Sequence, residues 1–230
     1  MSFNGFTPET LNYLVELKLN NSKEWYEANR DRYKEQVLKP FQELVLALSG
    51  SMLDIDPLFE VTPSVNKTIS RMYRDTRFSK DKSLYRDNVW ITFKRPRKEW
   101  TDSPAFFFEV FPGWYRYGMG YYSASRDSMD TMRKMIDEKP KNFLKAISFY
   151  KKQEVFTIEG DRYKRDIVTK APEINEWYNR KNLFVVHNSK EIKNIFSRNI
   201  AEEICQGFQM LEPVYKYLCE VEDRRKRERC

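Results

Sequence analysis

The hydrophobic period of the chain changes twice, and this restricts the fold more than any other feature. Residues 7–50 and 199–230 carry apolar side chains at three- and four-residue steps, which predicts helices. Residues 89–121 instead hold short aromatic and β-branched runs bounded by Pro and Gly, which are typical of strands. The short connections between these runs favour antiparallel pairing. The sequence therefore predicts an α+β fold, with an antiparallel sheet flanked by N-terminal and C-terminal helices.

Capping and helix-breaking residues place the expected helices. Thr7 caps a first helix with Pro8 in its first turn, and Ser22 caps a second helix. Pro40 is expected to kink or split that second helix, because its ring clashes with the preceding turn. The helix is expected to end near Gly50. Further helices are expected at 125–140, 140–153, 171–182 and 199–230, the last bent at Pro213.

The expected strands are aromatic or β-branched. Three of them follow one another closely, at residues 89–96, 105–112 and 114–122. The Gly118–Gly120 element is interpreted as a bend or bulge between aromatic strands. A hairpin is expected to turn at Gly160–Asp161. A further strand is expected at 183–188.

Composition limits the class of protein. A chain of 230 residues with 40% hydrophobic and 15% aromatic residues can bury a substantial core. No linker or repeat is evident, so we expect a single domain over residues 1–230. Three cysteines, without a CxxC pair, favour free thiols in a reducing compartment. No secretory signal or membrane-length apolar run is evident, so we expect a cytoplasmic protein without membrane association.

The segment RMYRDTRFSKDKSLYR, residues 71–86, is unusually basic for a stretch that also holds aromatic residues. Six of its sixteen residues are Arg or Lys, and only two are acidic. A carboxylate beside a guanidinium can orient it, and an oriented Arg can then bind phosphate or carboxylate. We therefore predict an anion site here, with Asp75 as the orienting group. The predicted anion contacts are Arg71, Arg74, Arg77, Lys80 and Lys82.

Two alternatives remain open for this segment. If residues 71–77 are extended, Arg71, Tyr73, Asp75 and Arg77 share one face, whereas a helix would cluster Arg71, Arg74 and Asp75. In either case Asp75 can form a purely structural ion pair with Arg71 or Arg74, since such networks are common.

Other residues are candidates for the lining of a pocket. Trp25, Asn29 and Tyr33 recur at four-residue steps on one helical face, which fits either a pocket wall or a core with satisfied polar tips. Arg133 can face inward toward the 71–86 segment or outward into solvent.

The remaining motifs favour structural roles. His187 is the only histidine, and its place near a strand end favours a hydrogen-bonded structural residue. The cysteine spacing does not suit a zinc site, and Asp54 and Asp56 are interpreted as turn residues rather than Mg²⁺ ligands, so no metal site is predicted. The C-terminal EDRRKRER run complements a helix dipole, with a nucleic-acid tail as the alternative.

The segments NNSKEWYEANRDRY and RMYRDTRFSKDKSLYR resemble a bacterial family known as domain of unknown function 2461, a set of conserved hypothetical proteins. The Gly118–Tyr121 element, the helix carrying Arg133 and the terminal GFQMLEPVYKYL fit the same resemblance, which covers nearly the whole chain. One departure is Leu84, where family members tend to have Pro before Tyr85. The resemblance implies an α+β domain and no established activity or cofactor.

The sequence thus predicts binding, with or without turnover, of a small anionic or phosphorylated ligand in a basic, aromatic-lined pocket. If the protein is an enzyme, Asp75 and Tyr85 are the acid or base candidates, with the arginines supplying electrostatic stabilisation. Two alternatives use the same segment: a nucleic-acid-binding module, and a structural or interaction protein held together by an Arg–Asp network.

Overall fold

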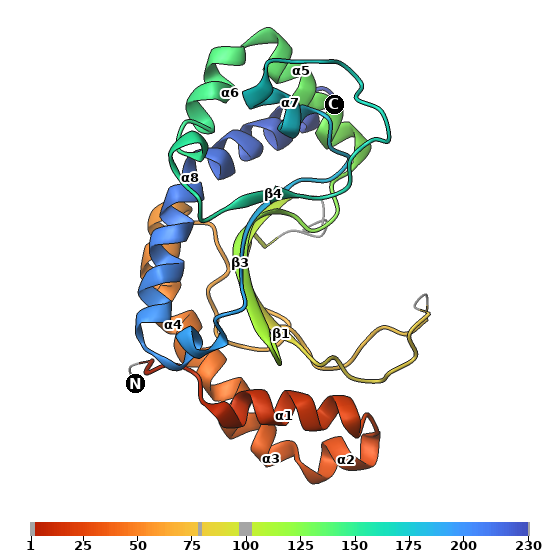
Figure 1. The fold of residues 1–230 in the computed structure, drawn as a ribbon, viewed down its shortest axis with the longest axis vertical. Coiled ribbons are helices and arrows are strands. Elements are labelled where there is room, and N and C mark those ends of the chain that lie inside the picture. Colours follow the sequence, from red (N-terminus) through yellow and green to blue (C-terminus); the bar gives the residue numbers. More distant parts are fainter. Residues whose placement is uncertain (1–2, 78–79, 97–102, 230) are drawn as a thin grey trace. The chain divides into compact units, whose positions relative to one another are not determined.

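The structure is a computed structural model that describes residues 3–77, 80–96 and 103–229. It has the predicted α+β fold (Figure 1). The strands are β1 Val89–Phe93, β2 Pro104–Phe111, β3 Trp114–Tyr121, β4 Thr157–Glu159 and β5 Phe184–Ser189. They form one antiparallel sheet in the order β1-β2-β3-β5-β4.

The α-helices are α1 Pro8–Leu19, α2 Lys23–Ala28, α3 Arg30–Arg32, α4 Lys39–Ile55, α5 Arg126–Glu138, α6 Pro140–Ala146, α7 Pro172–Tyr178 and α8 Asn199–Arg227. A π-helical segment, Tyr33–Leu38, joins α3 to α4, and 3₁₀ turns lie at Tyr150–Lys152 and Ile192–Phe196.

The chain divides into two compact units. Unit 1 comprises Met1–Phe93, Phe107–Tyr117 and Asn188–Gln206. Unit 2 comprises Lys94–Phe106, Gly118–His187 and Gly207–Cys230. Both units contain helices and strand residues, and each is described below by itself. The expectation of a single domain stays a prediction.

Each unit has an aromatic core. In unit 1 the rings of Phe6, Phe41 and Phe108 are in mutual contact, with centroids 4.8–6.3 Å apart. In unit 2 the ring of Phe106 contacts those of Phe208 and Tyr215, at 5.0 and 5.1 Å between centroids. Packed aromatic pairs of this kind contribute beyond their buried area. The high aromatic content of the sequence therefore resides mainly in these interiors.

The predicted helix starts are confirmed, and the expected disturbance at Pro40 is a π-helical segment just before it. Ser22 Oγ accepts a hydrogen bond from Trp25 N at 3.2 Å. Pro40 has no N–H to offer the carbonyl four residues earlier, which belongs to Gln36. The chain passes through the π-helical segment at this point, and the Thr10 hydroxyl of α1 donates to Gln36 O at 2.6 Å. A side chain of the neighbouring helix thus satisfies the carbonyl that the proline leaves open.

We expect Thr10→Val to lower the free energy of unfolding by about 1–2 kcal/mol, because the isosteric side chain leaves the Gln36 carbonyl without its donor. Thr10 is fully buried, so water cannot replace the hydroxyl easily. Urea denaturation of the variant measures the loss. Thr10→Ser, which keeps the hydroxyl, is the control and should lose less; an equal loss in both variants would point to the methyl group instead.

Two boundary predictions are wrong. The helix does not end near Gly50: α4 continues to Ile55, because Leu48, Met52 and Ile55 extend its buried stripe. The segment after Gly160 does not fold back as a hairpin either. β4 pairs with β5 instead, with Thr157 opposite Val186.

The Gly118–Gly120 element is part of β3 and not a bend between strands, which corrects the prediction. A Cβ on Gly118 would lie 2.1 Å from Val185 O, and one on Gly120 would lie 2.4 Å from Phe184 Cα. Both glycines therefore permit a close approach of the β3 and β5 backbones, a recognised use of glycine within strands.

Candidate site: a basic ribbon on unit 1

Residues 71–77 and 80–86 form the two arms of an extended ribbon, so the extended alternative is correct. Tyr73 pairs antiparallel with Tyr85. Arg74 N donates to Leu84 O and Arg86 N donates to Met72 O, both at 2.9 Å. Figure 1 shows this ribbon running out from the rest of unit 1. Phe78 and Ser79, between its two arms, lie outside the described residues.

The base of the ribbon is fixed by a tyrosine stack and an asparagine. The Tyr85 ring is stacked on Tyr26 at 4.4 Å and contacts Tyr73 at 4.7 Å. The Asn21 side-chain amide donates to Tyr85 O and accepts from Tyr85 N, both at 3.0 Å, as a neighbouring strand would. An isolated hairpin is only marginally stable in water, so these contacts are what hold the ribbon in place.

The two aspartates of the ribbon are both paired. Asp75 accepts from Arg77 Nε at 2.9 Å and from Arg77 Nη2 at 2.7 Å, a bidentate bond. These bonds from Arg77 hold the pKa of Asp75 well below its usual range. Arg74 bonds to Asp81 at 2.5 Å and to Ser83 Oγ at 3.2 Å. The expected pairing of Asp75 with Arg71 or Arg74 is therefore replaced by a pairing with Arg77, because Asp81 takes Arg74.

The other predicted anion contacts form no ion pair with a carboxylate within 4.0 Å among the described residues, although the charge of Arg71 also lowers the pKa of Asp75. Arg71 and Lys80 are exposed and form no ion pair within 4.0 Å. Lys82 is also exposed, and its Nζ donates to the carbonyl of Thr76 at 2.9 Å, which leaves its charge uncompensated. The ribbon thus keeps an excess of positive charge on an open surface rather than in an enclosed pocket.

The acid or base candidates lie in different surroundings. Asp75 is ionised and acts on Arg77, as the predicted orienting group would. The Tyr85 hydroxyl is buried, and burial raises the pKa of that phenol.

The side chains of the predicted pocket-lining residues on the N-terminal helices largely contact other residues of unit 1. Asn29 donates to Trp25 O at 2.9 Å and accepts from Arg32 at the same distance. The Tyr33 ring packs against Tyr13 and Tyr26 in the core. Tyr26 of α2 was not among the predicted site residues, yet its ring supports the ribbon. Its neighbour Trp25 drew attention instead because of the four-residue spacing with Asn29.

Arg133 is buried on α5 in unit 2, so the predicted solvated position is wrong. The predicted orientation toward the 71–86 segment is also wrong, because the guanidinium bonds to residues of unit 2. Its Nε donates to Tyr178 O at 2.9 Å and its Nη2 donates to Arg180 O at 2.5 Å. Nη1 bonds to Asp130 at 2.7 Å. All these partners belong to unit 2, where the guanidinium joins α5 to the last residue of α7 and to Arg180 just after it.

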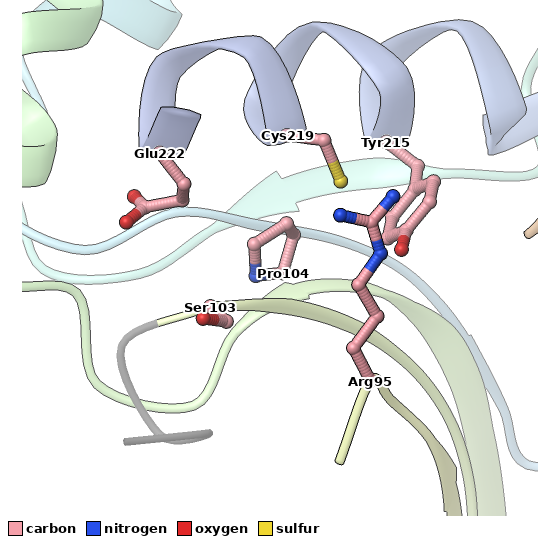
Figure 2. Close-up of a pocket in the computed structure, with 6 residues that line it drawn as sticks. All are labelled: Arg95, Ser103, Pro104, Tyr215, Cys219 and Glu222. Atoms are coloured by element: carbon pink, nitrogen blue, oxygen red, sulfur yellow. The ribbon is translucent and has the colours of Figure 1, made fainter. Parts of the chain in front are cut away.

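A small cavity in unit 2 was not predicted from the sequence (Figure 2). Its volume is about 10 Å³, which is room for about one water molecule. Glu222 lines it and is buried, paired with Arg225 at 2.7 Å and accepting from Tyr121 Oη at 2.9 Å. The other lining residues are Arg95, Ser103, Pro104, Tyr215 and Cys219. The cavity is too small for an organic ligand, which normally needs about 300 Å³ or more.

The remaining candidate motifs have structural contacts. His187 Nδ1 lies 2.9 Å from Val155 O, so the prediction of a hydrogen-bonded histidine is confirmed. Asp56 accepts from Leu58 N at 3.0 Å, as a turn residue does. Asp54 lies within α4, so its interpretation as a turn residue is wrong. In the part of the chain that the structure describes, no three His, Cys, Asp or Glu side chains gather as a metal site would need. No described helix is long and apolar enough to cross a membrane.

The basic C-terminal run is part of α8 and largely ion-paired within unit 2. Arg224 bonds to Glu138 and Glu228, and Arg225 bonds to Glu222. Arg229 pairs with Asp127. These contacts favour the structural interpretation of the run over a nucleic-acid tail.

Comparison with known proteins gives a family and no activity. No curated protein matches the chain significantly. The model of a family described as "Conserved hypothetical protein (DUF2461)" matches residues 9–217, a range that contains the whole basic ribbon. The chain therefore belongs to the DUF2461 family of conserved hypothetical proteins.

Proposed function

We propose that unit 1 binds the phosphate backbone of a nucleic-acid strand along the basic ribbon. The observation that supports this most is that Arg71, Lys80 and Lys82 are exposed and form no ion pair within 4.0 Å among the described residues, while both aspartates of the ribbon are bonded to other arginines. Phosphate contacts supply most of the affinity in such complexes, and lysines and arginines make them.

The spacing of these cations favours a strand over a single phosphate group. Lys82 Nζ is hydrogen-bonded to the carbonyl of Thr76. Thr76 is five residues after Arg71 on the same arm of the ribbon. An extended chain advances about 3.3 Å per residue, so this span is roughly 16 Å. Successive phosphates of a nucleic-acid strand can occupy such a span, whereas one phosphate group fills only part of it.

An exposed aromatic ring supports the same proposal. Tyr73 is 44% exposed, although its ring also rests on the buried ring of Tyr85. Proteins that bind single strands combine a basic track with aromatic rings on which bases stack. Tyr73 offers such a ring beside Arg71.

A second candidate is the small phosphorylated ligand that the sequence predicts. It is favoured by Arg77, whose guanidinium is oriented by Asp75 through two bonds close to Lys82. A ligand with one phosphate group would use this end of the ribbon and leave Arg71 aside.

A salt titration separates the two candidates. The first measurement uses a labelled oligothymidylate. If the protein contacts three or four of its phosphates, the logarithm of the association constant should fall with the logarithm of the salt concentration with a slope of about −2 to −3. Replacing Arg71, Lys80 and Lys82 together with Gln should reduce that slope by about 2 and weaken binding at least tenfold. Fluorescence anisotropy measures both quantities.

The matched control removes three charges from another exposed part of unit 1, by replacing Lys190, Lys193 and Arg198 with Gln. It should leave the binding and its slope unchanged. Equal weakening in both triple variants would mean that net charge alone matters, and would overturn the proposal. Binding of pyrophosphate without binding of the oligonucleotide would favour the small ligand instead.

A further inference from the structure

We propose a second binding site, in unit 2, for a small zwitterion of the free α-amino-acid type. It lies in a groove lined by residues of α5, α6 and the last turns of α8, elements labelled in Figure 1. The groove has a volume of about 350 Å³, within the range of small-molecule sites. It involves no residue of the basic ribbon, and the proposal does not depend on the function proposed for unit 1.

A residue that lines the groove has a buried hydroxyl without a partner. Tyr217 lines the groove, is only 5% exposed, and its ring packs on Phe143 at 5.2 Å. The Tyr217 hydroxyl has no hydrogen-bond partner among the described residues. Leaving a buried hydroxyl unpaired is costly, and a ligand carbonyl or carboxylate oxygen would accept its hydrogen bond.

Charged side chains of both signs that line the groove have no ion pair among the described residues. Lys139 and Arg227 are exposed and have no ion pair among the described residues, and the same holds for Glu220 and Asp223. Arg224 is different, because Glu138 and Glu228 already hold it at 2.5–2.8 Å. The groove thus offers two cations and two anions in addition to its one fixed ion pair.

This balance points to the chemistry of the ligand. A simple anion would face Glu220 and Asp223, and a simple cation would face Lys139 and Arg227. A molecule with a carboxylate at one end and an ammonium group at the other satisfies both pairs. Free α-amino acids have this pattern and fit within the volume of the groove.

The first experiment is a thermal-unfolding screen of the full chain with each of the common free L-amino acids. A ligand present at about ten times its Kd should raise the Tm by roughly 3–6 °C. The N-acetylated and methyl-ester forms of any amino acid that stabilises the protein should have no effect, because each lacks one of the two charges. No stabilisation by any free amino acid, or equal stabilisation by the blocked forms, would overturn the proposal.

Two variants then locate the site. Tyr217→Phe should raise the Tm of the ligand-free protein, because it removes an unpaired buried hydroxyl, and should weaken amino-acid binding about 2- to 10-fold. Replacing Lys139 and Arg227 with Gln should weaken binding at least tenfold, whereas Lys141→Gln, a neighbouring exposed lysine of α6, should not. Unchanged affinity in the first two variants would place binding elsewhere and refute this site.

Discussion

Replacing Gly120 with alanine is expected to lower the free energy of unfolding by more than about 4 kcal/mol, or to prevent unit 2 from folding. The added Cβ would lie 2.4 Å from both Cα and Cβ of Phe184 and 2.5 Å from Leu183 O. These are mainly backbone atoms of β5 and the residue before it, so no side-chain rotation relieves the clash. The β3 and β5 backbones would have to separate, with loss of bonds such as that from Tyr121 N to Leu183 O, at 3.0 Å.

The control for this prediction is Gly50→Ala. Gly50 lies within α4, and a Cβ there would meet no atom within 4 Å. Alanine should therefore stabilise the protein by about 0.5–1 kcal/mol, through its better helix propensity. Urea unfolding followed by far-UV circular dichroism measures both variants. A Gly120→Ala protein as stable as the wild type would show that β3 and β5 do not approach as closely as described.

This glycine pair illustrates why parts of the fold could not be predicted. The local signals were sufficient for the strands at 89–121 and for the caps at Thr7, Ser22 and Ser125, because capping and alternation act within a few residues. The role of Gly118 and Gly120 depends instead on β5, more than sixty residues later in the sequence. The pairing of β4 with β5 is of the same kind, and the local Gly160–Asp161 signal gave a hairpin that does not exist.

The candidate site shows the same division. Its basic character follows from residues 71–86 alone, whereas the sequence left both an extended and a helical form open for residues 71–77. The support of the ribbon by Asn21 and Tyr26 depends on contacts across about sixty residues, which no pattern in a single sequence reveals. The pairing of Arg74 with Asp81 could have been predicted from a local signal. Asp81 precedes Ser83 in an arrangement typical of an Asx turn, and its carboxylate accepts from Ser83 N at 2.9 Å.

The second large effect concerns Arg133, for which the sequence left both an inward-facing and a solvated position open. We expect Arg133→Met to lower the free energy of unfolding by about 3–5 kcal/mol. The variant keeps an apolar stem of similar length but removes the donors to Tyr178 O and Arg180 O, both buried hydrogen bonds. Arg133→Lys should also be destabilising, because an ammonium group cannot reproduce the planar arrangement of three bonded nitrogens.

Arg126→Met provides a closely matched comparison on the same helix. Arg126 pairs with the same acid, Asp130, at 3.4 Å, but its side chain is 85% exposed, against 6% for Arg133. Because exposed ion pairs contribute little, Arg126→Met should change stability by no more than about 0.5 kcal/mol. Guanidinium unfolding of the two variants therefore separates the bond to Asp130 from the bonds to the carbonyls. Similar losses of unfolding free energy in both variants would mean that the ion pair with Asp130 dominates. A loss confined to Arg133→Met would assign the stabilisation to the buried bonds from Arg133 to the carbonyls of Tyr178 and Arg180.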